Sequence, residues 1–324
     1  MNKIKVGIIG ATGLVGKTFL KYVLGDDRLE LHLFASSNSK NKIIEGYIVE
    51  ELNEQNITSL DYALFFAGSE VSKKYIPIAI ENNIRVIDNS SYYRQEIDVP
   101  LVVPSINIES VNNSLLISNP NCSTIQCVVP LFDLYLHYGI RKINYTTYQS
   151  VSGIGRKGLD ALERCYKNEK QSIFPYNIKF SCIPYIGKIL ANNYSEEEIK
   201  MINETKKIFN DYSLEIDATC VRVPIKNCHL VSVNVTLDKD FEIEDIKSIW
   251  SKNKSIILKD DPSQLDAYNN EDIYVGRVKK HLTNKKSLSF ICVADNLTRG
   301  AAYNAYEILD YLVKNRWLLI CFIL

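Results

Sequence analysis

Cys122 stands where a turn, a thiol and the start of a predicted helix coincide. Asn119, Pro120 and Asn121 before it favour a turn, and an apolar stretch with helical spacing follows it as far as Tyr135. The pattern therefore predicts Cys122 at a helix N-terminus, where unpaired backbone N–H groups and the helix dipole favour a thiolate. Such a thiolate is a nucleophile with donors already in place for an oxyanion. The alternative is a buried structural cysteine, the common state of this residue type.

The bulk composition is that of an ordinary globular chain, 46% hydrophobic and 23% charged. Its 324 residues are long enough for two domains of roughly 100–200 residues each. The 38 basic and 38 acidic residues cancel, so we expect neither nucleic acid nor a membrane as partner. The eight cysteines form no C-x-x-C pair, which predicts no metal site and no disulfide scaffold and fits a cytoplasmic location.

The two ends of the chain carry no recognised targeting or membrane signal. A charged strand pattern starts at Lys3, so we expect no signal peptide. Residues 317–324 are apolar but make up less than half a membrane span. We expect them to end a packed helix or to form a sticky tail.

The first forty residues resemble the opening of a mononucleotide-binding unit. Residues 4–9 are apolar and rich in β-branched types, which predicts a buried strand, and residues 17–24 have helical spacing. The loop between them consists of Gly10, Ala11, Thr12, Gly13, Leu14, Val15 and Gly16. Its glycines would let the backbone approach a pyrophosphate, whose charge the helix N-terminus stabilises. The alternative is a tight turn without a ligand.

The loop after the second predicted strand, residues 29–35, bears on which dinucleotide is bound. An NAD-preferring site usually has an Asp or Glu near this point to hold the ribose 2′-OH, and none is present. Instead the loop offers Ser36, Ser37, Ser39 and Lys40, which could receive a 2′-phosphate. The sequence therefore favours NADP over NAD, with a plain polar surface loop as the alternative.

Alternating strands and helices predict a parallel, doubly wound sheet in the first part of the chain. The expected elements are strands at 62–67, 85–88, 101–103 and 114–118 and a helix at 71–82. Longer strands with period two follow at 142–151, 218–223 and 229–236. They predict a second domain with a mixed or antiparallel sheet. A helix within 296–315 could return to the first domain, so we expect domains at 1–121 with 297–324 and at 122–296.

Five stretches together resemble the aspartate-semialdehyde dehydrogenase family, from residue 4 to about 314. They are residues 10–16, 119–124, 148–153, 222–229 and 294–302. The resemblance implies an α/β chain, with a Rossmann-type dinucleotide-binding domain and an α+β catalytic and dimerisation domain built on a mixed sheet. It also implies a homodimer that interconverts aspartate 4-semialdehyde with phosphate and 4-aspartyl phosphate, with NADP as cofactor, in lysine, threonine and methionine biosynthesis.

The family's functional residues can be placed on matching positions of this chain. The implied catalytic residues are Cys122 as nucleophile, His229 as acid/base and Gln149, which orients the acyl intermediate. The implied substrate contacts are Arg222 for the carboxylate, Glu197 for the ammonium, Arg94 and Lys200 for phosphate, and Asn121 beside the nucleophile. The implied additional cofactor contacts are Gly153 and Asn296.

Each of these positions also has an ordinary structural interpretation. Ser195 predicts a capped helix start that places Glu197 and Lys200 on one face, which elsewhere would be a solvated surface pair. A strand histidine is often simply packed, and a lone arginine such as Arg94 is usually on the surface. Asn38 departs from the family, because an arginine is common in that loop.

Three other functions remain open. An N-acetyl-glutamyl-phosphate reductase shares the thioester chemistry, but its substrate has no free ammonium for Glu197 to bind. Glyceraldehyde-phosphate dehydrogenase has a different signature around its cysteine. A catalytically inactive dinucleotide sensor could have lost Cys122, Gln149 or His229, and this chain has all three.

Overall fold

The computed structural model describes residues 3–112 and 114–323, with side chains as far as residue 315. The chain divides into two compact units, one of Met1–Pro120 with Ala301–Leu324 and one of Asn121–Gly300. These boundaries lie within a few residues of those expected at 121 and 297. The side chains of the apolar tail 316–324, for which the sequence predicts a packed helix end or a sticky tail, lie outside the described residues. Within the described part of the chain, no helix is long and apolar enough to cross a membrane.

The first unit is built on a seven-stranded sheet of order β3-β4-β2-β1-β5-β6-β7. In chain order its strands are β1 (Ile4–Ile9), β2 (Leu29–Ala35), β3 (Ile43–Ile44), β4 (Tyr47–Glu51), β5 (Tyr62–Phe65), β6 (Arg85–Asp88) and β7 (Leu116–Ser118). All neighbours pair in parallel except β3 and β4. The predicted doubly wound sheet is confirmed, with β1, β2 and β6 at the expected residues.

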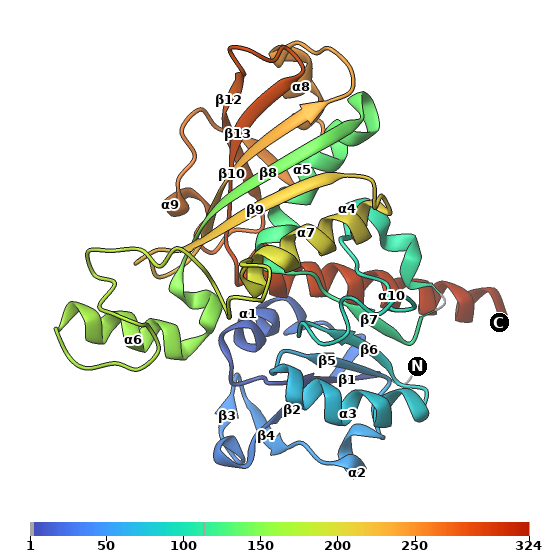
Figure 1. The fold of residues 1–324 in the computed structure, drawn as a ribbon. Coiled ribbons are helices and arrows are strands. Elements are labelled where there is room, and N and C mark those ends of the chain that lie inside the picture. Colours follow the sequence, from blue (N-terminus) through green and yellow to red (C-terminus); the bar gives the residue numbers. More distant parts are fainter. Residues whose placement is uncertain (1–2, 113, 324) are drawn as a thin grey trace. The chain divides into compact units, whose positions relative to one another are not determined.

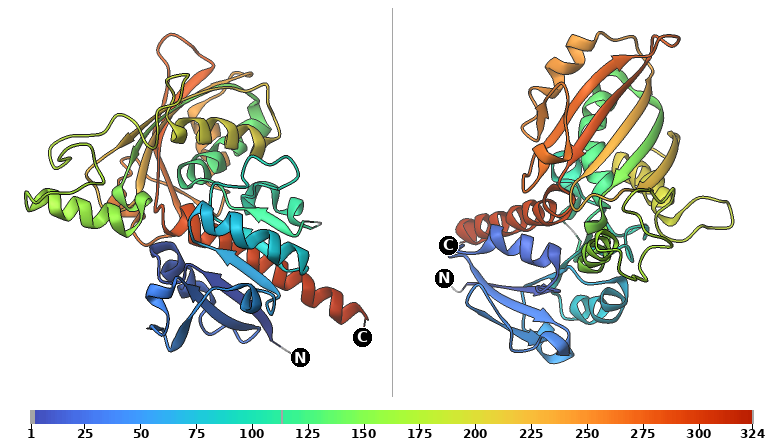
Figure 2. Two further views of the ribbon diagram at one scale, coloured as in Figure 1. Left: turned by 60° about the horizontal axis from the view of Figure 1, so that its bottom comes forward. Right: turned by 90° about the vertical axis from the view of Figure 1, so that its left-hand side faces the viewer.

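Helices cover both faces of this sheet (Figures 1 and 2). They are α1 (Leu14–Val23), α2 (Glu54–Ile57), α3 (Ser69–Glu81), α4 (Pro104–Asn107), α10 (Tyr303–Ile323) and the 3₁₀ turns η1 (Ser37–Ser39) and η2 (Ile108–Val111). On one face α1 and α10 bury Phe19, Leu20 and Leu309 against the strands, and on the other α3 buries Ile76. Removing such apolar surface from water supplies most of the stability of the unit.

The prediction of a strand at residues 101–103 is wrong. Leu101 makes a single parallel bridge to Ser118, and the chain then enters α4. The backbone N–H of Val103 donates to the side chain of Asn107 at 2.9 Å, so it cannot continue a ladder. Pro104 has no N–H and is pre-set for the first helical position, which ends the extended segment.

The second unit is built on a six-stranded mixed sheet of order β11-β12-β13-β10-β8-β9. In chain order its strands are β8 (Ile140–Gln149), β9 (Glu215–Arg222), β10 (His229–Leu237), β11 (Ile256–Leu258), β12 (Ile273–Lys280) and β13 (Ser287–Ala294). β8 and β9 run parallel, whereas β10 is antiparallel to both β8 and β13. The predicted mixed sheet is confirmed, and the three long strands start and end close to the expected residues.

The helices and turns of the second unit are α5 (Cys122–Tyr138), η3 (Val151–Ile154), α6 (Arg156–Tyr166), α7 (Glu196–Phe209), α8 (Ile243–Trp250), α9 (Gln264–Ala267) and the π turn η4 (Thr298–Ala302). The helices α5 and α7 contact each other and lie on one face of that sheet, whereas α6 packs on η3 (Figure 1). Alternate residues of β10, such as Val231 and Val233, are buried beneath α5, and the residues between them are half-buried. α9 packs its Ala267 on the opposite face, against Val293. This alternation is the period-two pattern expected of a strand with one fully covered face.

Candidate active site

Cys122 is the first residue of α5, as the sequence predicted. Asn121 is the N-cap, and its side-chain oxygen accepts from the backbone N–H groups of Ser123 at 2.9 Å and Thr124 at 3.3 Å. Cys122 itself is half-buried. A Cβ added at Gly300 would lie 2.7 Å from the Cβ of Cys122, so the backbone of η4 packs directly on this residue. The thiol therefore sits at the positive end of a capped helix, where the thiolate form is favoured.

Three functional side chains meet at one edge of the sheet because of the strand register. Gln149 ends β8 and Arg222 ends β9, and the two residues are direct partners in this parallel pair. His229 begins β10, which runs antiparallel to β8, so it lies at the same edge. All three are buried on the face that carries α5. The carboxyl ends of parallel strands are where ligands commonly bind in α/β sheets.

His229 is a neutral hydrogen-bond donor in this arrangement. The backbone N–H of Ser150 donates to its Nδ1 at 3.1 Å, so Nδ1 is the acceptor and the ring proton belongs on Nε2. Nε2 is buried and has no hydrogen-bond partner among the described residues. Burial first, and then the nearby charge of Arg222, lower the pKa of His229 from 6.5 to about 3. The ring thus has one N–H available for a bound molecule.

Arg222 places a buried positive charge beside His229. Its Nη1 donates to the carbonyl of Ser150 at 2.6 Å. A Cβ added at Gly153 would lie 3.1 Å from that Nη1 and 3.6 Å from Nε2 of His229, so the missing side chain keeps this space open. Burial lowers the pKa of Arg222, against the opposing charges of Glu197 and Cys122. An arginine fork suits a carboxylate ligand.

Glu197 supplies a negative charge from the first turn of α7. Its carboxylate accepts from the side-chain amide of Asn121 at 2.8 Å and pairs with Lys200 at 3.3 Å. Burial alone would raise the pKa of Glu197, but Lys200, Asn121 and Arg222 together hold it below its ordinary value. The residue is therefore an ionised carboxylate within the cluster. The predicted cap is present, since Ser195 and Glu198 form a reciprocal capping box.

The first unit has a separate cavity of about 500 Å³ at the carboxyl ends of β1, β2 and β5. Its lining includes the predicted Gly10, Thr12, Gly13, Ser36 and Ser37. Gly10 has φ +85°, and a Cβ there would lie 2.7 Å from a backbone oxygen, so only glycine fits. Ala11 is buried, and Leu14 and Val15 open α1, whose N-cap Gly13 makes no side-chain cap bond.

Glu51, the last residue of β4, also lines this cavity and was missed from the sequence. The loop after β2 has no acidic residue, but β4 pairs beside β2 and brings Glu51 opposite Ala35. Lys40 lies 3.7 Å from Glu51, and Ser39 accepts from Lys42 at 3.3 Å. Neither Ser39 nor Lys40 lines the cavity.

Two residues predicted to contact ligands make hydrogen bonds to other groups of the protein. Arg94 belongs to the first unit, where it is buried and donates to the carbonyl of Asn89 at 2.9 Å. Asn296 belongs to the second unit, where its side-chain oxygen accepts from the N–H of Cys228 at 3.0 Å and from the hydroxyls of Ser150 and Ser152. Asn296 therefore shapes the strand ends around His229.

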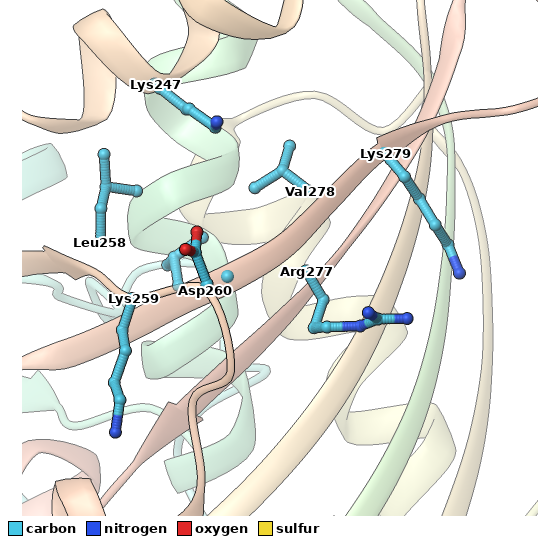
Figure 3. A pocket seen from close by; sticks show the side chains of 9 residues that line it. Lys247, Leu258, Lys259, Asp260, Arg277, Val278 and Lys279 are labelled. Atoms are coloured by element: carbon cyan, nitrogen blue, oxygen red, sulfur yellow. The ribbon is translucent and has the colours of Figure 1, made fainter.

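A further cavity of about 350 Å³ lies at the β12 end of the second sheet (Figure 3). Lys247, Lys259, Arg277 and Lys279 line it together with Asp260. Lys259, Arg277 and Lys279 extend in different directions, so they do not converge on one ligand. Lys259 is also paired with Asp266. This cavity has no arrangement that could do chemistry.

Comparison with known proteins decides the family. Residues 5–114 match the model of the semialdehyde dehydrogenase NAD binding domain, and residues 129–299 match that of the semialdehyde dehydrogenase dimerisation domain. The chain is 40% identical to aspartate-semialdehyde dehydrogenase 2 of Vibrio cholerae, over 97% of this chain and 99% of that one. It is 38% identical to aspartate-semialdehyde dehydrogenase of Aquifex aeolicus, over 96% and 98% respectively. The chain belongs to the aspartate-semialdehyde dehydrogenase family.

Solved structures of the family agree with this assignment. A crystal structure of Vibrio cholerae aspartate semialdehyde dehydrogenase II complexed with ASA has a TM-score of 0.91 at 38% identity, covering 97% of this chain and 99% of that one. A Candida albicans aspartate semialdehyde dehydrogenase solved with NADP shares the fold, with a TM-score of 0.77 at 23% identity, covering 96% and 98%. As a family member, the chain is an oxidoreductase with a domain for a nicotinamide dinucleotide.

The predicted residues of the aspartate-semialdehyde dehydrogenase site are divided between the two units. The second unit brings together Cys122, Asn121, Gln149, Gly153, Glu197, Lys200, Arg222 and His229. Arg94 and the glycine loop belong to the first unit. Sequence reasoning missed Glu204, which accepts from the backbone N–H of Asn121 at 2.6 Å. Its spacing of seven residues from Glu197 was the available signal, since that spacing repeats one helix face.

Proposed function

We propose that this chain reversibly converts L-aspartate 4-semialdehyde, phosphate and NADP into 4-phospho-L-aspartate and NADPH, through a thioester on Cys122. The observation that carries the proposal is the cluster of a helix-start thiol, an arginine fork, an ionised carboxylate and a neutral histidine N–H in the second unit. This set matches an aldehyde substrate that also bears a carboxylate and an ammonium. The reaction belongs to the biosynthesis of lysine, threonine and methionine.

Paired opposite charges supply the substrate specificity. Arg222 binds the substrate carboxylate through two parallel N–H bonds, while Glu197 binds the ammonium. Glu197 is held ionised by Lys200 and Asn121, so it can act as this counter-charge. An N-acetylated substrate has no ammonium to pair with Glu197, and this missing interaction disfavours the reductase alternative.

The chemistry divides one difficult oxidation into two steps. The Cys122 thiolate attacks the aldehyde carbon, and the carbonyl π electrons move onto oxygen, which becomes an oxyanion. Nε2–H of His229 stabilises that charge, because the backbone N–H groups of Ser123 and Thr124 at the start of α5 already donate to Asn121. Loss of hydride restores the carbonyl as a thioester. A phosphate oxygen then attacks this carbonyl, and the sulfur leaves as thiolate while Gln149 orients the acyl group.

His229 was expected to act as both acid and base, and its hydrogen bonds support only the role of proton donor. A ring whose Nε2 already carries the proton cannot take another from the thiol, and Nδ1 is occupied by the N–H of Ser150. We therefore assign the ionisation of Cys122 to the helix terminus and to the adjacent Arg222, with the thiol proton released to solvent.

The dinucleotide supplies or accepts the hydride when it is bound. The Gly10 cradle and the uncapped start of α1 fit a pyrophosphate, which approaches backbone N–H groups closely. Ser36 and Ser37 line the cavity and would hold the ribose, and Lys40 pairs with Glu51, which also lines it. NADP is favoured because these groups can bind a 2′-phosphate, although Glu51 opposes that charge. Ser39, Gly153 and Asn296 complete the proposed set.

Two further parts of the proposal concern phosphate and assembly. Arg94 in the first unit and Lys200 in the second are each proposed as a contact for phosphate. The chain is proposed to act as a homodimer in the cytoplasm, as its dimerisation-domain match suggests. Sedimentation over a range of protein concentrations tests the dimer, and a monomer throughout would contradict it.

The deciding experiment is reduction of NADP, and separately of NAD, by the purified protein with L-aspartate 4-semialdehyde. We expect turnover that requires phosphate. Cys122→Ser should bind NADP normally yet lose nearly all turnover, since the hydroxyl is a far weaker nucleophile. Substantial activity in that variant would remove Cys122 from the mechanism, and turnover without phosphate would exclude the acyl-phosphate product.

A further inference from the structure

The N-cap of α5 is held by a carboxylate from a different helix. In an ordinary capping box, the third helical residue of the same helix accepts from the N-cap backbone N–H. In α5 that residue is Thr124, whose hydroxyl is buried and makes no hydrogen bond within the described residues. Instead Oε2 of Glu204 in α7 accepts from the N–H of Asn121 at 2.6 Å. Glu204 thus makes the hydrogen bond that a capping-box glutamate would make, although it lies 83 positions away in the sequence.

Asn121 is consequently fixed at several points immediately before Cys122. Its side-chain oxygen caps α5, its side-chain amide donates to Glu197, and its backbone N–H donates to Glu204. Glu197 and Glu204 are seven residues apart, so they project from one face of α7, two turns from each other. The same helix therefore sets the position of the residue proposed for the substrate ammonium and of the residue that precedes the thiol.

α7 is itself anchored independently of this contact. Oε1 of Glu198 accepts from the backbone N–H of Cys220 in β9 at 2.9 Å, and Oε2 accepts from the N–H of Ser195. Glu204 has 0% of its surface exposed. Burying a carboxylate costs several kcal/mol unless hydrogen bonds offset it, as general burial energetics indicate. A buried carboxylate on an anchored helix is a rigid support for whatever it binds.

We propose that Glu204 is a positioning residue that fixes the start of α5 and thereby aims Cys122 at the substrate carbon. Its contribution is geometric and not electrostatic, because a negative charge near the helix N-terminus opposes the thiolate that the dipole favours. This inference rests on the proposed use of Cys122 as nucleophile. It predicts that kcat depends more on the acceptor oxygen and the side-chain length at position 204 than on the charge there.

The test compares Glu204→Gln with Glu204→Asp. Glutamine keeps the length and an acceptor oxygen but removes the charge, whereas aspartate keeps the charge and withdraws it by one methylene. We expect kcat within about threefold of wild type for Gln and a loss of about 10–100-fold for Asp, since a displacement near 1 Å can cost about 100-fold. KM for the semialdehyde should stay within about threefold in both variants, because Arg222 still binds the carboxylate.

Glu198→Asp is the matched control, with the same shortening on the same helix and another backbone N–H as partner. It should lower the melting temperature but lower kcat less than Glu204→Asp does, because Glu198 accepts no hydrogen bond from Asn121 within the described residues; this separates a general loosening of α7 from misplacement of Cys122. The second readout is the rate of iodoacetamide reaction at the Cys122 peptide as a function of pH. In Glu204→Gln its midpoint should move to lower pH, because an opposing charge has been removed.

The ranking of the variants decides the inference. If Glu204→Gln loses as much kcat as Glu204→Asp, or more, the charge matters and the geometric role is overturned. Wild-type kcat in Glu204→Asp would overturn any positioning role. Failure of the proposed function is recognised separately, because the wild-type protein would then show no phosphate-dependent turnover, or Cys122→Ser would retain it, whatever the Glu204 variants do.

Discussion

His229 should stay neutral down to acidic pH, and lowering the pH from 8 to 5 tests this directly. Its side chain has 0% of its surface exposed, and burial with the charge of Arg222 lowers its pKa to about 3. At pH 5 a group with that pKa is about 1% protonated, whereas an ordinary histidine near 6.5 is about 97% protonated. The expected difference is therefore almost a full proton at a single ring.

The same shift has a consequence for stability with a definite sign. Below pH 6.5 the unfolded chain binds a proton at residue 229 and the folded chain does not until about pH 3. Stability that is fully present above pH 6.5 is thus lost progressively as the pH falls toward 3. Between pH 8 and pH 5 this one group should lower the free energy of unfolding by roughly 2 kcal/mol.

The assay is NMR of the protein labelled with ¹⁵N-histidine, which reports both protonation and tautomer. The chain has only four histidines, and the other three, His32, His137 and His281, are exposed or half-buried. His229→Asn identifies the signal by its loss. We expect one ring with its proton on Nε2 and no titration between pH 8 and pH 5.

Two outcomes would refute this reasoning. A signal from His229 that titrates near 6.5 would mean that the site is wetter than its burial implies. A proton on Nδ1 at neutral pH would mean that the bond from Ser150 is not made. Nε2 could then accept a proton, and His229 would return as the base that ionises Cys122.

Four further substitutions test other parts of the proposed function. Gly300→Ala should lower kcat about 10–100-fold and the free energy of unfolding by about 1–3 kcal/mol, because its Cβ would lie 2.7 Å from that of Cys122; steady-state kinetics and thermal melting would show it, and unaltered kcat would contradict the contact. Arg222→Lys should lower kcat/KM for the semialdehyde about 10–100-fold with an unchanged Kd for NADP, because a point charge cannot form the paired bonds; a change in the Kd for NADP alone would refute the assignment. Lys40→Ala should weaken the binding of NADP more than that of NAD, and Glu51→Gln should strengthen the binding of NADP relative to NAD. Calorimetry measures both affinities. Equal effects on the two cofactors would contradict a 2′-phosphate contact in this loop.

Local patterns in the sequence were sufficient for most of the fold. The β1 strand and the glycine loop were predictable because apolar runs, glycines and helical spacing are all local signals. The capped start of α7 was predictable for the same reason, since Ser195 and Glu198 are only three residues apart. The strand expected at 101–103 failed where a side chain, Asn107, competed for a backbone N–H.

The parts that the sequence did not reveal all depend on contacts between distant segments. Glu51 lines the predicted dinucleotide cavity from the neighbouring strand β4, so the residues of the loop after β2 give no signal for it. Glu204 caps a helix that starts 83 residues earlier. The tautomer of His229 follows from the N–H of Ser150, 79 residues away. Residue types and spacing indicated which groups could react, whereas register and packing determine which proton or charge each of them carries.

The register of the second sheet explains why burial and chemistry coincide in this enzyme. Gln149, Arg222 and His229 occupy the same face as the apolar core residues of their strands, so each is the polar end of an otherwise buried row. Burial of that row lowers the pKa of His229 and keeps its N–H for an oxyanion, while burial also lowers the pKa of Arg222 and the charge of Glu197 opposes that shift. The arrangement costs stability, since apolar side chains at these positions would pack without desolvating a charge. Substitutions that extend the apolar rows to the strand ends should therefore stabilise the fold and abolish turnover together.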